Sequence, residues 1–149
     1  MKIRSVTYFC NPKYPLNESV ILRAGDFLRS ARAAYEAAGY EVQTTRLATV
    51  PFPRLLGEKR LKALPALAQE LDRMIQQIDV GYASLGPAMP QVPASYELIP
   101  EAIAGTRNVF FGGLMTDRRR GLDLAAVRRC AQVIIKCAPI DPNGFANLR

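Results

Sequence analysis

The chain has 149 residues, of which 49% are hydrophobic, and this length and composition predict one domain with a sizeable core. Its formal charge is +7, but lysine and arginine divide equally between residues 1–60 and 61–149, so the chain has no basic tail or arm. Histidine is absent, which excludes Ser-His-Asp and Cys-His catalytic systems and the usual histidine-bound zinc sites from within this chain.

Four segments are typical of β-strands, because β-branched and aromatic residues gather in them between turn signals. They are residues 2–9, 41–49, 79–86 and 107–113. A long helix is predicted between the N-cap Asn17 and Gly39, since apolar residues recur there at helical spacing. A second helix is predicted over about 59–78, with an equally supported start near Leu64 that places Pro65 in the first turn.

The second half of the chain predicts two further helices. Residues 94–104 form a short helix that Pro100 kinks or divides, and Asp123 caps a helix that continues to about Ala138. The stretch VPFPRLLG (50–57) breaks the second strand, and the tail PIDPNGFANLR holds turn signals. The resulting β-α-β-α-β-α-β-α order predicts an α/β fold of alternating units with a largely parallel sheet, in a single domain over residues 1–149.

The three cysteines, Cys10, Cys130 and Cys137, are an odd number without the spacing of a metal site. Cys130 and Cys137 lie two helical turns apart, about 10 Å along the axis, which is too far for a disulfide; packing is their expected role. Neither a signal peptide nor an apolar stretch of membrane length is evident. We therefore expect a reduced, cytoplasmic protein that binds neither a metal nor a membrane.

Ligands of open α/β sheets collect at the carboxyl ends of the strands, and one basic loop follows such an end. Three arginines there precede a helix N-terminus, where the helix dipole disfavours cations and a bound phosphate or carboxylate would offset them. The predicted anion site consists of Gly112, Gly113, Arg118, Arg119, Arg120 and Asp123. A solvated loop, or a contact to the rest of a larger protein, is the alternative, because the spacing matches no nucleotide-binding motif.

Cys10 and Asn11 end the first predicted strand and belong to the same rim. Cys10 is a candidate nucleophile by position, but a buried, inert thiol is the simpler interpretation without a histidine to activate it. Glu97 and Glu101 lie four residues apart and either share a proton or a cation or form a solvated acidic edge. These patterns assign no catalytic residue and no cofactor.

Three segments, KIRSVTYF, SYELIPEAIAGTRNVFFGG and RRRGLDLAAVRRCAQVIIKCA, resemble the domain-of-unknown-function family 711, also called uncharacterised protein family 0210. The resemblance runs along nearly the whole chain. It implies a fold like the ten-stranded α/β barrel of glycyl-radical enzymes, with these residues as an N-terminal half-barrel of a longer protein. Phe110 and Phe111 stand where the family often has a polar residue, and no glycyl-radical motif is visible, so radical chemistry does not transfer.

The first functional hypothesis is an enzyme or sensor that binds a small anionic metabolite at the strand-end rim. The second is a structural half-barrel or oligomerisation domain that pairs with the rest of its own chain or another copy and has no site of its own. Nucleic-acid binding is a weaker third hypothesis, because the aromatic residues mostly sit inside hydrophobic runs.

Overall fold

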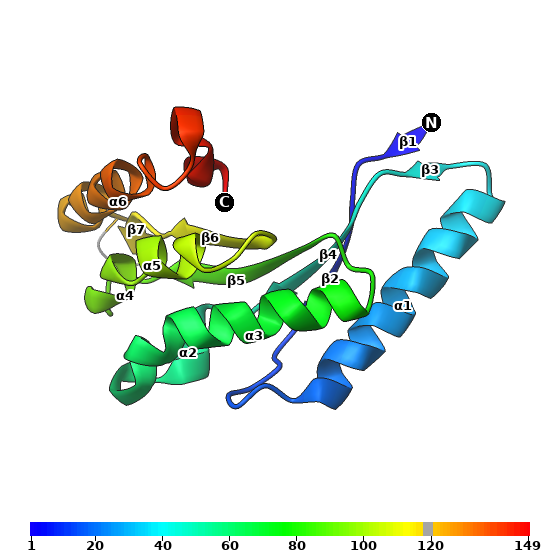
Figure 1. Ribbon diagram of the computed structural model, residues 1–149, viewed down its shortest axis with the longest axis horizontal. Helices are drawn as coiled ribbons and strands as arrows, with labels where there is room; N and C mark the ends of the chain where they lie inside the picture. Colours follow the sequence, from blue (N-terminus) through cyan, green and yellow to red (C-terminus); the bar gives the residue numbers. More distant parts are fainter. Residues whose placement is uncertain (118–120) are drawn as a thin grey trace.

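Four parallel strands form the central sheet of the computed structural model, which describes residues 1–117 and 121–149 (Figure 1). In spatial order they are β2 (Val6–Cys10), β4 (Thr45–Thr49), β5 (Tyr82–Ala88) and β6 (Val109–Gly113). Each follows the last along the chain, with helical segments between them, as β-α units require. The predicted α/β fold with a parallel sheet is confirmed, and the half-barrel that the resemblance implies stays a prediction.

The first two predicted strands are each interrupted. Residues 2–9 divide into β1 (Lys2–Ile3) and β2, and residues 41–49 into β3 (Glu41–Val42) and β4. β1 and β3 pair in parallel and continue the β2–β4 ladder beyond a short irregular segment. At this interruption the Thr44 hydroxyl donates to the Arg4 carbonyl over 2.9 Å, so the backbone of Arg4 is held at the edge of the sheet.

The long helices lie close to their predicted positions. α1 (Glu18–Ala37) begins after Asn17, whose Oδ1 accepts a hydrogen bond from the Ser19 amide over 3.1 Å, and Gly39 follows its end with φ +84°. α3 (Leu64–Gln77) has the later of the two predicted starts, with Pro65 in the first turn and the 3-10 segment η1 (Glu58–Ala63) before it.

A proline lies in or directly before the first turn of each of the shorter α-helices. The predicted helix over 94–104 is divided just before Pro100 into α4 (Ala94–Glu97) and α5 (Ile99–Ala104). The second strand does end at VPFPRLLG, since β4 stops at Thr49. A short helix that the sequence patterns did not predict, α2 (Phe52–Leu56), follows, with Pro53 in its first turn, where a proline is tolerated.

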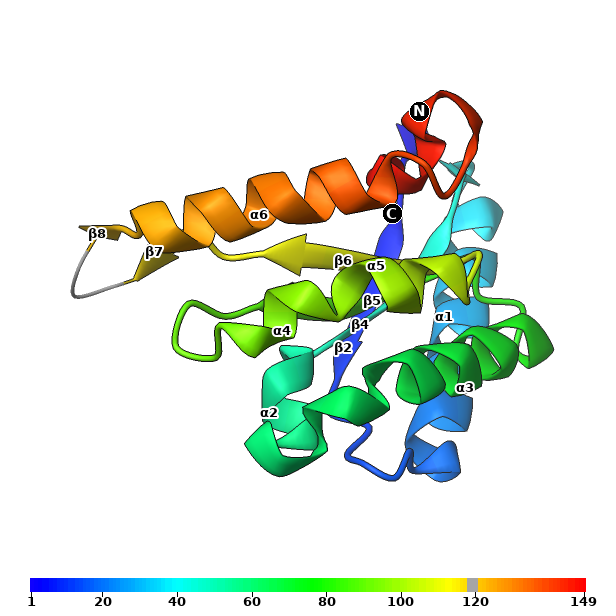
Figure 2. The same ribbon diagram turned by 60° about the vertical axis from the view of Figure 1, so that its left-hand side comes forward.

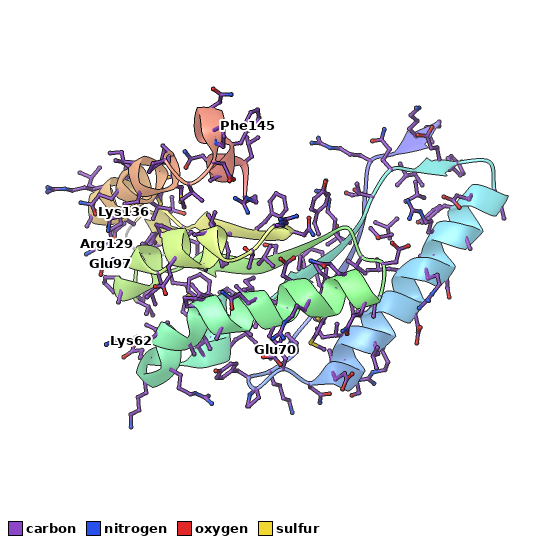
Figure 3. The ribbon with its side chains drawn as sticks, in the orientation of Figure 1. Lys62, Glu70, Glu97, Arg129, Lys136 and Phe145 are labelled. Atoms are coloured by element: carbon purple, nitrogen blue, oxygen red, sulfur yellow. The ribbon has the colours of Figure 1, made fainter. Side chains whose placement is uncertain are left out.

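The last third of the chain runs beside the edge strand β6 (Figure 2). β7 (Thr116–Asp117) and β8 (Gly121–Leu122) form a small antiparallel pair that the sequence patterns did not predict. α6 (Leu124–Cys137) then lies alongside β6, and the 3-10 segment η2 (Pro142–Leu148) follows it, with Phe145 at the surface (Figure 3).

The core lies on one face of the central sheet, where α1, α2, α3 and α5 cover it (Figure 1). Successive side chains of a strand point to opposite faces, so Leu47, Leu85 and Val109 enter the core while their neighbours face the other way. On that second face Phe9 is 77% exposed. Parallel sheets are normally covered on both faces. This second face, which the described residues leave uncovered over much of β2, β4 and β5, is called the open face below.

Candidate functional site

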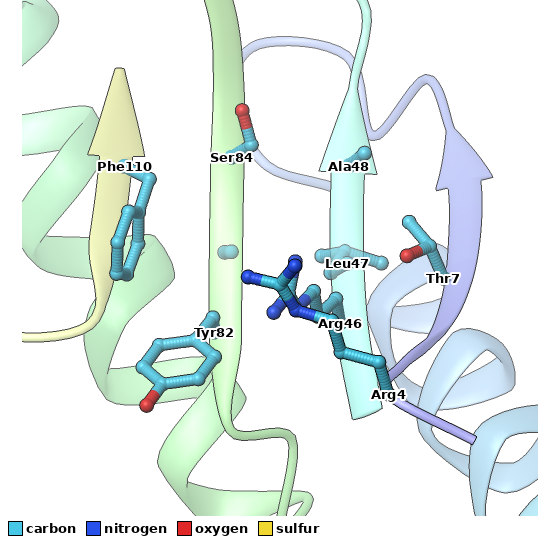
Figure 4. A pocket seen from close by; sticks show the side chains of 9 residues that line it. Arg4, Thr7, Arg46, Leu47, Ala48, Tyr82, Ser84 and Phe110 are labelled. Atoms are coloured by element: carbon cyan, nitrogen blue, oxygen red, sulfur yellow. The ribbon is translucent and has the colours of Figure 1, made fainter. Parts of the chain in front are cut away.

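The open face carries a hollow of about 490 Å³ over the first residues of the four central strands (Figure 4). Its lining combines two arginines, two hydroxyl side chains, two aromatic rings and a floor of small or apolar residues. These are Arg4, Thr7, Arg46, Leu47, Ala48, Tyr82, Ala83, Ser84 and Phe110. Ligand pockets of proteins span about 300–1,000 Å³, so the hollow is large enough for an organic molecule.

Strand register arranges the lining in two rows across the sheet. Thr7, Arg46 and Tyr82 are direct neighbours on β2, β4 and β5, and they form the first row. Two residues further along, Ala48, Ser84 and Phe110 are direct neighbours on β4, β5 and β6. The first row therefore carries long side chains at Arg46 and Tyr82. The second row carries the short side chains of Ala48 and Ser84 and then the ring of Phe110.

Positive charge dominates the hollow. Arg4 and Arg46 both line it, and Figure 4 shows their side chains extending across the open face. Neither forms an ion pair with a carboxylate in residues 1–117 or 121–149. Two guanidinium groups in one hollow, with no carboxylate partner in the described part of the chain, favour the binding of an anion, since arginine stays charged at any physiological pH.

The Nε atom of Arg46 is buried and has no hydrogen-bond partner within the described part of the chain. Its guanidinium lies over the Tyr82 ring, with Cζ 5.9 Å from the ring centroid. The ring orients the charge but offers no acceptor in the plane of the guanidinium. A buried donor without an acceptor costs free energy, so a ligand oxygen that meets this N–H after a small rotation of the side chain would be stabilised.

Ser84 adds a hydroxyl at the centre of the second row. Its Oγ accepts a hydrogen bond from the Gly86 amide over 3.3 Å, and its own O–H is free to rotate toward the hollow. The lining contains no carboxylate, thiol or imidazole. The arrangement can therefore bind and orient an anion, but these side chains supply no general base at neutral pH.

The anion site predicted from the sequence, at the end of β6, shares no residue with the lining of this hollow. Arg118, Arg119 and Arg120 lie outside the described residues. Asp123 caps α6, with Oδ1 accepting from the Ala126 amide over 2.9 Å. The anion site predicted for this loop stays a prediction.

The two glycines of that predicted site differ from one another. A Cβ on Gly113 would lie 2.7 Å from Cys130 Sγ and 3.1 Å from Tyr96 Cε1, so Gly113 is required for α6 to pack against β6. A Cβ on Gly112 would meet nothing nearer than Pro87 Cβ at 3.9 Å. Gly113 thus has a packing role, whereas the space at Gly112 leaves room for a ligand.

Cys10 is the last residue of β2, and Asn11 follows it at the same rim. Cys10 packs against the core side of the sheet, and burial raises the pKa of its thiol, which opposes a nucleophilic role. Asn11 Oδ1 accepts a hydrogen bond from the Lys13 amide over 3.1 Å, so this side chain stabilises the turn after the strand.

The other candidates noted in the sequence are separated from the hollow. Cys130 and Cys137 pack α6 against its neighbours, as predicted, and burial raises the pKa of both thiols. Glu97 is the last residue of α4, and it lies near two basic residues of α6, Arg129 and Lys136 (Figure 3). No group of three or more Cys, Asp or Glu residues within 1–117 and 121–149 is arranged to hold a metal ion.

Sequence reasoning missed the hollow, although one signal was present. Strands of a parallel sheet that is covered on both faces read as nearly continuous apolar runs. The segment TRLAT of β4 instead places Arg46 between the buried Thr45 and Leu47. A charged residue inside a predicted parallel strand indicates that one face is open or lines a site.

Two comparisons with known proteins bear on this fold. A family model described as Uncharacterised ACR (DUF711) matches residues 1–149. The chain is also similar to the UPF0210 protein MK1214 of Methanopyrus kandleri, with 26% identity over 144 residues. That alignment covers 89% of this chain and 32% of the relative, so the chain spans about a third of the relative's length. None of the helices described is long and apolar enough to cross a membrane.

Proposed function

The chain belongs to the family described as Uncharacterised ACR (DUF711), and within it we propose that the open face of the sheet binds a small organic molecule with a carboxylate or phosphate group. The observation that carries this proposal is the buried Nε of Arg46, which has no partner among the described residues. An anionic oxygen at that position would satisfy the donor and neutralise part of the charge of both arginines.

Arg4 would bind the same anionic group from the edge of the sheet. A guanidinium group forms two parallel hydrogen bonds with a carboxylate or phosphate. Two arginines in one hollow would therefore bind such an anion more strongly than they bind water. Thr7 and Ser84 supply neutral donors on either side of β4. The hollow thus offers charge and directed hydrogen bonds together.

Binding is the part of the hypothesis that these residues support. If the whole protein is an enzyme or a sensor, its acid–base groups or signalling contacts come from outside this lining. The predicted loop Arg118–Arg120 is one source, and the further length found in the relative is another. Gly112 is the second-to-last residue of β6, and a Cβ there would meet nothing nearer than Pro87 Cβ at 3.9 Å, so a larger ligand has room to extend along this strand.

Nuclear magnetic resonance of the arginine Nε–H groups tests the proposal directly. Titration with inorganic phosphate and with acetate should shift the Arg46 Nε–H signal, because a new acceptor changes its hydrogen bonding. Arg54, an exposed arginine on α2, is the matched control and should report only ionic strength. An Arg46 signal that moves no more than the Arg54 signal would contradict the proposal.

A second candidate is a packing surface for further polypeptide. Phe9 is 77% exposed on the open face, and Leu124 and Ile135 of α6 are 73% and 71% exposed. Such side chains are stabilised when another surface covers them. Light scattering of residues 1–149 tests pairing with a second copy: association should rise with concentration and fall in Phe9→Asp, whereas a monomer at every concentration would rule out that pairing.

A further inference from the structure

We infer that the ligand of the open face is an aromatic acid, with a planar ring joined to its carboxylate or phosphate and with no amino group. This inference rests on the proposed function and adds the class of molecule. It is carried by the aromatic residues of the hollow, by its volume and by the absence of carboxylates from its lining.

The aromatic residues lie next to the charge. Tyr82 is the direct neighbour of Arg46, and its ring packs against the Phe110 ring with centroids 5.0 Å apart and an interplanar angle of 84°. The guanidinium of Arg46, the Tyr82 ring and the Phe110 ring therefore form one continuous wall of flat groups (Figure 4). A planar group attached to an anion at Arg46 would meet ring faces or edges along this wall, which is the geometry that aromatic pairs prefer.

The floor beside that wall is made of small side chains. Ala48 and Ser84 are the neighbours of Phe110 in the second row, and both side chains are short. The hollow of about 490 Å³ is much larger than a bare phosphate or acetate ion needs. A ring laid over Ala48 and Ser84 would fill this space and bury apolar area that a bare ion lacks.

The lining also excludes one large class of aromatic acids. Aromatic amino acids carry an ammonium group, which needs a carboxylate or several acceptors once it leaves water. The residues that line the hollow include no Asp or Glu, and two arginines repel a further cation. An aromatic carboxylate or an aryl phosphate without an amine matches this charge pattern.

The experiment compares ligands that differ in one property. Benzoate, cyclohexanecarboxylate and acetate share a carboxylate, while phenyl phosphate and inorganic phosphate form a second pair that distinguishes the two anionic groups. Affinities are measured by isothermal titration, with the Arg46 Nε–H signal as the reporter of position. We expect benzoate or phenyl phosphate to bind more tightly than its ring-free partner, and benzoate more tightly than both cyclohexanecarboxylate and phenylalanine.

Three variants at two phenylalanine positions localise the effect. Phe110→Leu keeps an apolar side chain but removes the ring, and should weaken binding of the ring-bearing ligand about 2- to 12-fold without changing that of phosphate or acetate. Phe9→Leu removes an exposed ring that is on the same face but outside the lining, and should change nothing. Phe110→Tyr, which retains a ring, should keep the preference and guards against a general packing defect.

The possible results distinguish a failure of the aromatic-acid inference from a failure of the proposed anion binding. If acetate or phosphate shifts the Arg46 signal, but benzoate gains nothing over cyclohexanecarboxylate and phenyl phosphate gains nothing over inorganic phosphate, the aromatic class is wrong and anion binding stands. If phenylalanine binds as tightly as benzoate, the exclusion of amines is wrong. If no anion moves the Arg46 signal, the proposed function fails and the inference fails with it.

Discussion

The guanidinium of Arg46 lies over the ring of Tyr82, its direct neighbour on β5, with Cζ 5.9 Å from the ring centroid. This contact holds a charged group against the sheet while Nε stays buried without an acceptor. The cation–π interaction offsets only part of that cost, so Arg46 keeps a buried donor that no described residue satisfies.

Replacement of Arg46 by methionine should separate binding from stability. Arg46→Met removes the charge and the buried donor but keeps a flexible apolar stem against Tyr82, so the free energy of unfolding should stay constant or rise slightly. Anion binding should weaken by about 1.5–3 kcal/mol, the usual value of a hydrogen bond to a charged group. Urea unfolding and calorimetric titration measure the two effects, with Arg54→Met as the charge-matched control. A variant that loses stability and retains affinity would show that Arg46 is structural.

Replacement of Gly113 by alanine should loosen α6. The new methyl group would lie 2.7 Å from Cys130 Sγ and 3.1 Å from Tyr96 Cε1, and we expect a loss of about 1–3 kcal/mol from overpacking. Gly112→Ala is the neighbouring control and should be nearly neutral. Removing the sulfur in Gly113→Ala/Cys130→Ala should recover part of the loss in a double-mutant cycle; strict additivity would contradict the packing role.

Asp72 should be a stabilising residue that the helix pattern alone does not reveal. It lies on α3, is 8% exposed, and its carboxylate accepts from the amides of Arg107 and Asn108 over 2.9 and 3.2 Å. Asp72→Ala leaves two backbone donors without partners before β6 and should cost about 2 kcal/mol. Chemical unfolding measures the change. Asp26→Ala breaks an exposed ion pair with Arg29 and should cost less than about 1 kcal/mol.

Stability should fall at alkaline pH. Burial raises the pKa of the Cys10, Cys130 and Cys137 thiols, and it raises the pKa of Tyr96 to about 12. The unfolded chain therefore loses these protons first, so the free energy of unfolding decreases as the pH rises above the ordinary thiol pKa.

Urea midpoints across this pH range check the alkaline loss. Because the Tyr96 hydroxyl donates to the Leu114 carbonyl over 2.5 Å, Tyr96→Phe should lower stability near neutral pH and flatten the most alkaline part of the curve. Tyr35→Phe, at a side chain that is 43% exposed, is the control. A midpoint that stays constant up to high pH would contradict the shifted pKa values.

Local signals determined the elements of the fold. Asn17 and Asp123 cap their helices as predicted, Pro65 sits in a first turn, and the helix over 94–104 divides before Pro100. Such signals act within a few residues, so the sequence displays them directly. The order of strands and helices then implies a parallel sheet, because β-α units connect in that way.

The candidate site depended on contacts that no local pattern contains. Register across three strands made Thr7, Arg46 and Tyr82 neighbours, although they are far apart in the chain. The same packing placed Gly113 against Cys130 of α6 and Tyr96 of α4. Helical periodicity identifies an apolar pattern but not which neighbours will cover it, and Leu124 and Ile135 of α6 are exposed for that reason. The sequence by itself determined the elements, their caps and their order; only tertiary packing decided which face of the sheet stays open, since burial depends on residues distant in the chain.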